Sequence, residues 1–142
     1  MMHQTTEPQK LQMLKAGQHL GTFPCKDGGA ATVFDDYGHH PTEIEMTLKA
    51  LRSSELPKRL ICVFQPHQHS RTRFLLDQFA QSFSSADEII VPHIYFVRDS
   101  EAEQQRVSAQ DLVDKLDAQG LDAKHINNFD DIILLLQENA LD

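Results

Sequence analysis

The stretch Asp35-Asp36-Tyr37-Gly38-His39-His40-Pro41-Thr42-Glu43 begins with two acids, a tyrosine, a glycine and two histidines in succession. We call residues 35–43 the first loop. It lies between the apolar run at residues 31–34 and a helical pattern that begins at Pro41. A strand therefore leads to a polar loop at a helix N-terminus, where α/β proteins place ligand sites because free N–H groups and the helix dipole point there. The stretch predicts a ligand site on an α/β fold.

Length and composition are those of one globular domain. The chain has 142 residues, 40% of them hydrophobic and 24% charged. No apolar run approaches the roughly 20 residues that a membrane span needs. The first residues also lack the basic and then apolar segments of a signal peptide. We therefore expect a cytoplasmic protein with no membrane partner.

The formal net charge of -8 argues against a nucleic-acid partner, because nucleic-acid affinity depends on clustered Lys and Arg. Arg71 and Arg73 form the informative basic pair. Only Cys25 and Cys62 occur, and Cys62 lies within the apolar run at residues 60–64. A buried, unreactive thiol is the simpler interpretation of Cys62, and this cysteine usage fits a reducing compartment.

The first half of the chain predicts a hairpin, a helix and a strand. Residues 1–17 are interpreted as a linker or the remnant of an upstream region, and residues 18–142 as the domain. Strands at 19–25 and 30–35 flank a turn with Asp27-Gly28, a typical hairpin signal. Pro41 begins a helix that ends near residues 53–54. Residues 60–64 are apolar without alternation, which predicts a central strand.

A second polar loop, residues 65–73, follows that strand. A helix with apolar positions Leu75, Leu76, Phe79 and Phe83 comes next, and Ser70 or Thr72 is its expected N-cap. The remaining expected elements are a strand at 88–91, an irregular crossing at 92–106, a helix from Ser108 to Gly120, a strand at 121–126 and a helix capped by Asn128. The series ends on a helix, so we expect that a final strand of the fold is missing.

Polar side chains of both loops are expected to meet in one crevice, because right-handed crossovers bring the C-terminal ends of parallel strands to the same edge. The five residues with the chemistry of such a site are Asp36, His39, His40, His67 and Arg71. A metal site is an alternative, since His67 and His69 have a chelating spacing. However, no His-Glu-x-x-His helix or cysteine pair completes a ligand set, and we predict no bound metal. The chain also lacks a Gly-x-x-x-x-Gly-Lys-[Ser/Thr] loop for phosphate.

Both loops carry a family resemblance. The first loop, followed by Phe64-Gln65-Pro66-His67 and then by Ser70-Arg71-Thr72-Arg73, resembles the C-terminal domain of the Mur ligases. The Mur branch that ligates a recycled tripeptide usually has Glu-Pro-Arg-Ser where this chain has Gln65-Pro66-His67-Gln68. Within the family, the chain is therefore more similar to the branch that joins L-alanine to UDP-N-acetylmuramate. The resemblance extends over residues 23–142.

The resemblance implies a Rossmann-like, three-layer α/β domain with a mostly parallel sheet and an N-terminal hairpin, truncated before its last strand. It implies an ATP- and Mg²⁺-dependent ligase of bacterial peptidoglycan synthesis, with this domain presenting the amino acid to a central ATPase domain. The isolated chain is then expected to be inactive and to bind neither cofactor. Two alternatives stay open: a non-enzymatic binding module of the same fold, and a stand-alone metal-site protein.

The resemblance also implies a role for each matched residue. Asp36, Tyr37 and His39 are nucleotide-binding positions, while His40, His67 and Arg71 are substrate-binding positions, and no catalytic residue is expected within this chain. The chain departs from the family where Gln68 and His69 replace an arginine and an aromatic residue. This departure removes a fixed positive charge next to the expected site.

Overall fold

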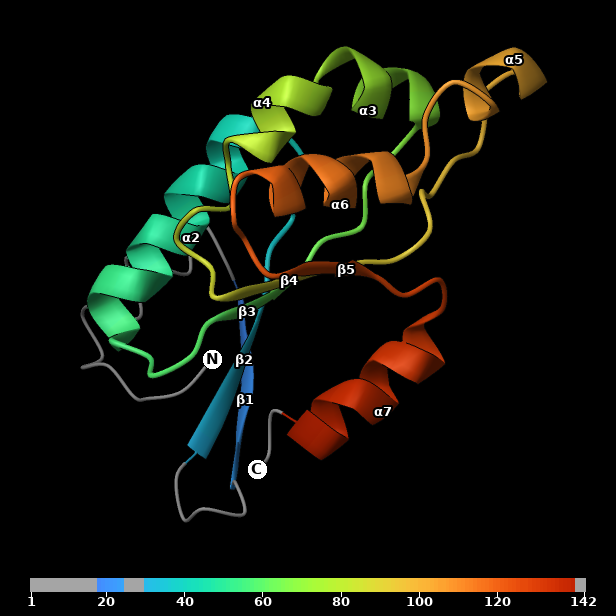
Figure 1. The fold of residues 1–142 in the computed structure, drawn as a ribbon. Coiled ribbons are helices and arrows are strands. Elements are labelled where there is room, and N and C mark those ends of the chain that lie inside the picture. Colours follow the sequence, from blue (N-terminus) through green and yellow to red (C-terminus); the bar gives the residue numbers. More distant parts are fainter. Residues whose placement is uncertain (1–17, 25–29, 140–142) are drawn as a thin grey trace.

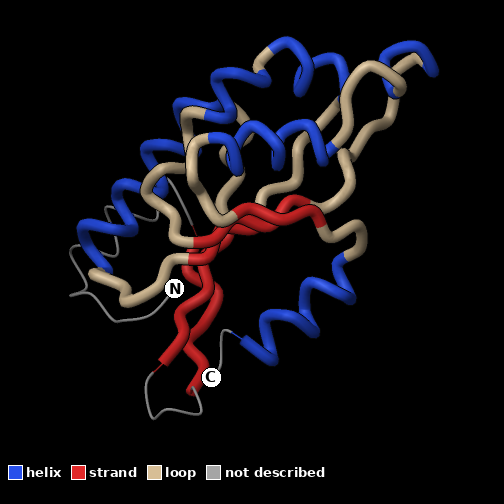
Figure 2. The backbone as a smooth tube through the Cα atoms, viewed as in Figure 1, coloured by secondary structure: helices blue, strands red, loops and turns tan. Residues whose placement is uncertain are grey.

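The computed structural model describes residues 18–24 and 30–139 of the chain, and a three-stranded parallel sheet lies at its centre (Figures 1 and 2). The strands β3 (Ile61–Val63), β4 (Glu88–Val91) and β5 (Ala123–His125) are arranged in the order β3-β4-β5. The central strand is β4, whose four residues are all buried. The prediction that residues 60–64 form the central strand is wrong. The buried side chains of this run, Leu60 and Phe64, flank β3 rather than lie in it.

The predicted N-terminal hairpin is confirmed. Strand β1 (Gln18–Pro24) pairs antiparallel with β2 (Ala30–Asp35) in a separate two-stranded sheet. Among the described residues, β2 thus forms no ladder with β3, although Phe34 packs against the main core. The expected turn at Asp27-Gly28 and the expected linker at residues 1–17 lie outside the described residues.

Helices cover both sides of the parallel sheet, as a three-layer fold requires. Figure 1 shows α3, α4 and α6 on one side and α7 on the opposite side. The helix bounds are α2 (Pro41–Glu55), α3 (His69–Phe74), α4 (Leu76–Ala80), α5 (Glu101–Gln104), α6 (Ala109–Ala118) and α7 (Phe129–Asn139). The short helix α5 lies within the crossing that was expected to be irregular. No helix among the described residues is long and apolar enough to cross a membrane.

Two predicted helix starts are confirmed by their hydrogen bonds. At α6, Ser108 and Asp111 form a reciprocal capping box, in which each side chain accepts a hydrogen bond from the other residue's backbone N–H. At α7, the Asn128 Oδ1 accepts a 2.9 Å bond from the backbone N–H of Asp131. Both caps satisfy orphan N–H groups with side chains within three positions along the chain.

The helix predicted after the second loop is divided into α3 and α4. Leu75, with φ -103° and ψ 13°, interrupts it. The interruption lets α4 bury Phe79, whose ring centroid is 5.3 Å from that of Phe64, while Phe74 at the end of α3 remains 82% exposed. The main core therefore anchors α4 through Phe79, whereas α3 buries the polar residues His69 and Thr72 and leaves Phe74 exposed.

Helix α7 is only partly packed. Of its predicted apolar face, Ile132 is buried, whereas Phe129 and Ile133 are 44% and 51% exposed. Ile132 is also outside the main hydrophobic cluster. The amphipathic pattern predicted the helix correctly, but not the burial of its apolar face.

Candidate functional site

Asp36 stands at the end of β2 and is half-buried. Its Oδ2 accepts a 2.9 Å hydrogen bond from the Thr47 hydroxyl of α2. Burial raises the pKa of Asp36, and hydrogen bonds from Thr47 and the Gly38 backbone only partly oppose that rise. A Cβ on Gly38 would stand 2.5 Å from Asp36 Oδ2. A side chain at this position would therefore displace the Asp36 carboxylate from its present place.

Asp36 also lies beside β3, because its charge contributes to raising the pKa of Cys62. Burial is the larger cause, and together they raise the pKa of the Cys62 thiol to about 12. The thiol is therefore protonated at neutral pH, which agrees with the interpretation of Cys62 as an unreactive residue.

Tyr37 and His39 are exposed residues of the first loop. Tyr37 is 92% exposed. The His39 Nδ1 lies 2.9 Å from the Tyr37 carbonyl oxygen, and the His39 backbone N–H donates to Glu43 Oε2 at 3.3 Å. These contacts order the loop and leave the Tyr37 ring accessible to a planar ligand.

His40 is the N-cap of α2, a role that the sequence reasoning did not assign. Its Nδ1 accepts a 3.2 Å hydrogen bond from the Thr42 backbone N–H, and Pro41 follows in the first turn. An accepting Nδ1 carries no proton, so the neutral ring carries its proton on Nε2. A ligand would therefore be contacted through the Nε2 edge.

The second loop is held by the crossing segment, residues 92–106. Tyr95 donates its N–H to the Pro66 carbonyl at 2.9 Å and accepts one from Gln68 at 2.6 Å. The exposed His67 ring packs against the Tyr95 ring with centroids 5.3 Å apart. His67 thus lies on the surface, next to an aromatic side chain.

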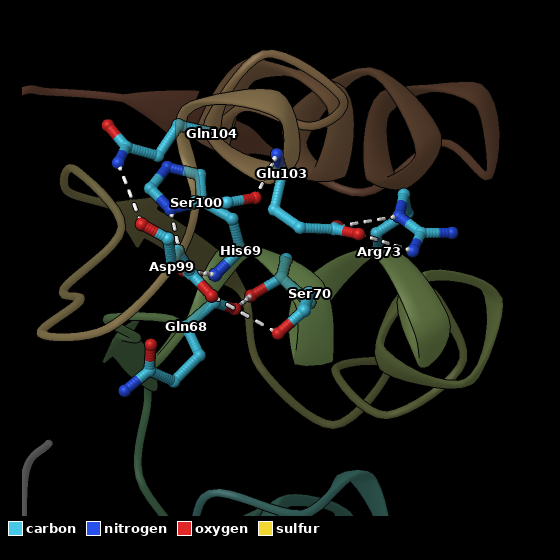
Figure 3. Close-up of polar contacts among 9 residues, drawn as sticks. Gln68, His69, Ser70, Arg73, Asp99, Ser100, Glu103 and Gln104 are labelled. Atoms are coloured by element: carbon cyan, nitrogen blue, oxygen red, sulfur yellow. Dashed lines mark hydrogen bonds and ion pairs between the residues drawn. The ribbon is translucent and has the colours of Figure 1, made fainter.

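The expected N-cap of the second loop's helix, Ser70 or Thr72, is wrong. Helix α3 begins at His69 after Gln68, and Gln68 makes no side-chain cap. Asp99 supplies the acceptor instead: its carboxylate accepts hydrogen bonds from the His69 backbone N–H and the Ser70 hydroxyl (Figure 3). Sequence reasoning missed Asp99, since a cap 30 residues away leaves no local pattern.

The two arginines of the second loop differ in their partners. Arg73 donates two hydrogen bonds, both 3.1 Å, to the Glu103 carboxylate. Arg71 is half-buried, and among the described residues its guanidinium has no ion pair. Arg71 is therefore the cation of this loop that remains available to an anionic ligand.

The His-x-His spacing does not bring its two imidazoles together. His67 is exposed, whereas His69 is buried with its Nδ1 3.0 Å from Asp99 Oδ2. Among residues 18–24 and 30–139, no group of three or more His, Cys, Asp or Glu side chains is arranged to hold a metal.

The first loop follows β2 of the antiparallel hairpin, whereas the second loop follows β3 of the parallel sheet. In the described part of the chain, no hydrogen bond, ion pair or ring contact connects residues 35–43 with residues 65–73. An open groove of about 460 Å³ lies between the first turn of α2 and α4, but Asp36, His67 and Arg71 do not line it. The convergence of the two loops in one crevice therefore stays a prediction.

A polar contact at the ends of β3 and β4 was also missed. The Gln65 Nε2 donates to the His93 carbonyl at 3.1 Å and lies 3.3 Å from the His93 ring Nε2. The other ring nitrogen of His93 is 2.8 Å from the Asn127 carbonyl. His93 follows Pro92 in a segment with no motif, so no local pattern pointed to it.

A parallel sheet with helices on both faces, and with polar residues shortly after β3 and β4, is typical of Rossmann-like nucleotide and substrate domains. Residues 23–142 match the Mur ligase, glutamate ligase domain family. The chain therefore belongs to that family, as its two loops predicted.

Similar proteins agree with this assignment. A UDP-N-acetylmuramate–L-alanine ligase of Caldanaerobacter subterraneus is 48% identical over 109 residues, covering 77% of this chain and 23% of that protein. The ligase of the same name from Clostridium botulinum strain Langeland is 48% identical over 118 residues, covering 83% and 25%. The chain thus spans about a quarter of the length of these relatives.

Solved structures support the fold. The UDP-N-acetylmuramate-alanine ligase of Thermotoga maritima superposes with a TM-score of 0.52 and 26% identity, over 71% of this chain and 19% of that one. A murein peptide ligase from Psychrobacter arcticus gives a TM-score of 0.62 at 22% identity, over 88% and 24%. The second likeness concerns the fold alone.

Proposed function

We propose that this chain acts as the C-terminal domain of an ATP-dependent ligase that adds L-alanine to UDP-N-acetylmuramate in bacterial peptidoglycan synthesis, in the cytoplasm. The observation that carries the proposal is the 48% identity to ligases of that name over a stretch that includes most of this chain. The chain alone is proposed to be inactive.

The first loop is proposed to contact the nucleotide. Asp36 offers a carboxylate acceptor for ribose hydroxyls, fixed in place by Thr47 and Gly38. Tyr37 presents an exposed ring on which a base can stack, and His39 lies beside it. ATP would supply the energy of an acyl phosphate when bound to the complete enzyme.

The fit of the described residues to Mg²⁺ is poor, because they contain no cluster of three ligand side chains. We therefore assign the metal and the phosphate groups to the central ATPase domain of the complete ligase. This chain would contribute Asp36, Tyr37 and His39 to the ribose and base of the nucleotide only.

The second loop is proposed to hold L-alanine. Arg71 has a planar guanidinium without a carboxylate partner in the described chain, and a carboxylate is the natural ligand of such a fork. His67 lies two residues before the start of α3, whose first turn carries Ser70 and Arg71, and His40 presents its Nε2 edge from the other loop. Together these groups would hold the carboxylate and orient the amine for attack.

A domain graft tests the proposal. The stretch of the Clostridium botulinum ligase that matches this chain is replaced by this chain, and phosphate release from ATP is measured with UDP-N-acetylmuramate and L-alanine. We expect release that depends on L-alanine. The ligase with the stretch deleted is the control, and we expect it to be inactive. A folded graft that binds UDP-N-acetylmuramate but shows no L-alanine-dependent release would contradict the proposal.

A further inference from the structure

Gln68, in the middle of the second loop, has an unusual backbone conformation. Its φ of 68° and ψ of 129° lie in a region that side chains other than glycine rarely adopt. Such strain persists only where surrounding contacts hold the backbone, and it is found most often at functional sites. The contacts that hold Gln68 therefore indicate what the fold requires at this position.

Contacts on both sides of Gln68 come from the same loop and from the crossing segment. Its N–H donates to the Tyr95 carbonyl at 2.6 Å. Its carbonyl accepts two bonds from Thr72, from the backbone N–H at 3.0 Å and from the hydroxyl at 2.8 Å. Thr72 is fully buried. These bonds fix the peptide groups but do not explain how α3 starts directly after a strained residue.

Asp99 accounts for that start. One carboxylate oxygen accepts from the His69 backbone N–H and from the His69 Nδ1, the latter at 3.0 Å, and the other accepts from the Ser70 hydroxyl at 3.2 Å. The Asp99 side chain is only 5% exposed. A buried carboxylate with three charge-assisted hydrogen bonds is a strong, directional anchor. Asp99 thus binds both residues that follow Gln68, namely His69 and Ser70.

Asp99 is itself held in place. The Gln104 side chain donates to the Asp99 carbonyl at 3.1 Å, and the His69 ring packs edge-on against Phe96 with centroids 4.8 Å apart. Figure 3 shows Asp99 between His69 and Gln104, with the separate Arg73–Glu103 pair further along α3. The crossing segment therefore acts as a rigid template for the second loop.

We propose that Asp99 is a positioning residue of the site. By holding the first turn of α3 and the strained turn at Gln68, it sets where His67 and Arg71 lie. The inference rests on the proposed function, because His67 and Arg71 are the groups assigned to the carboxylate of L-alanine. Asp99 touches neither substrate in this role, and it acts only through its hydrogen bonds to His69 and Ser70.

The first arm of the test measures local order in the 142-residue chain by NMR amide hydrogen exchange. Asp99→Asn removes the charge and one acceptor, so we expect exchange at residues 69–72 to become roughly 10- to 100-fold faster, with β4 unchanged. His69→Phe, which keeps a ring against Phe96 and removes the Nδ1 donor, should give a smaller change in the same direction. Glu103→Gln is the matched control and should leave residues 69–70 within about twofold.

The second arm measures the grafted ligase. Asp99→Asn should raise the KM for L-alanine roughly 10-fold or more and leave the KM for ATP within about twofold, while Glu103→Gln leaves both within about threefold. A purely structural cap would instead lower the amount of folded enzyme and leave both KM values unchanged.

The outcomes separate this inference from the proposed function. Unchanged exchange at residues 69–72 in Asp99→Asn overturns the positioning role. Faster exchange with an unchanged KM for L-alanine also overturns it, because the loop would then move without affecting the substrate. If the unmodified graft shows no dependence on L-alanine, the proposed function fails and the link from Asp99 to L-alanine fails with it.

Discussion

The two loops of the candidate site are ordered in opposite ways. The first loop is held by residues within eleven positions along the chain: Tyr37 bonds to His39, His40 to Thr42, and Asp36 to Thr47. The second loop depends on Tyr95 and Asp99, about 30 positions away. Local sequence therefore encodes the first loop, and tertiary structure encodes the second.

This difference has a functional side. A locally ordered loop keeps its shape when the rest of the domain fluctuates, and under the proposed function this would suit the recognition of a nucleotide that another domain presents. A loop that relies on a distant template is rigid only when the whole domain is folded. Under the proposed function, amino-acid binding should then be more sensitive than nucleotide binding to changes in the domain.

The largest expected effect is at Arg71, in the second loop. In the grafted ligase, Arg71→Ala should lower kcat/KM for L-alanine by roughly 30-fold to 1000-fold, because a charge-assisted pair in a closed site contributes on the order of 2 to 4 kcal/mol. Arg71→Lys keeps the charge but loses the planar guanidinium, so its kcat/KM for L-alanine should lie between those of the parent and of Arg71→Ala. Steady-state kinetics with varied L-alanine and varied ATP measure both effects.

Arg73→Ala is the matched control, since Arg73 is already paired with Glu103 and is exposed. Its effect on the KM for L-alanine should be small. If Arg71→Ala instead raises the KM for ATP and leaves kcat/KM for L-alanine unchanged, the second loop contacts phosphate. The division of roles between the two loops is then wrong.

A second prediction concerns the loss of stability at low pH, where protonation of Asp99 weakens its hydrogen bonds to the second loop. Burial acts to raise the pKa of Asp99, but hydrogen bonds from His69 and Ser70 outweigh it and hold the pKa below its usual value. The stabilisation is complete above about pH 5 and is lost as pH falls through about 4 towards the folded-state pKa. The thermal midpoint should thus fall by several degrees between pH 5 and 3, and less in Asp99→Asn.

Asp87 contributes to the same loss of stability at low pH. Hydrogen bonds from Arg52 and the Leu60 backbone outweigh the effect of burial and lower the pKa of Asp87. In the double variant with Asp99→Asn and Asp87→Asn, the thermal midpoint should therefore change less between pH 5 and 3 than in either single variant. A midpoint whose acid dependence is the same in Asp99→Asn and the parent chain would show that the Asp99 contacts contribute nothing to folding.

The same local-to-distant contrast explains what the sequence could predict. The capping box at Ser108 and the cap at Asn128 were predicted because their partners lie three residues away. The start of α3 could not be predicted, because Asp99 carries no local signal. Strand order failed for a related reason: buried Leu60 and Phe64 made an edge strand look central. Five of the six site residues were selected from the two strand-to-helix loops, whereas Tyr37 and the individual roles came from the family resemblance. Their convergence stays a prediction.

A third prediction separates two roles of His40 in the first loop. His40→Ala removes the cap of α2 and should cost about 1 kcal/mol of stability, measured by chemical denaturation of the chain. His40→Asn restores a cap and should return the stability to that of the parent. If the Nε2 edge also contacts substrate, His40→Asn will still raise the KM for L-alanine in the grafted ligase. Full recovery of both properties would make His40 a cap only.

The smallest expected effect is at Asp36, and its sign is opposite to that at Asp99. Burial raises the pKa of Asp36, so the folded chain binds a proton there more tightly than the unfolded chain does, and stability falls as pH rises through this window. Asp36→Asn removes the cost of the buried charge and can still accept the Thr47 hydrogen bond. The thermal midpoint at pH 7 should therefore rise slightly, by about 1 to 3 °C, while the KM for ATP in the grafted ligase increases. A variant that is less stable at pH 7 would mean that the carboxylate is needed to hold the first loop. The first loop would then depend on a buried charge much as the second loop depends on Asp99, and the contrast between the two loops would disappear.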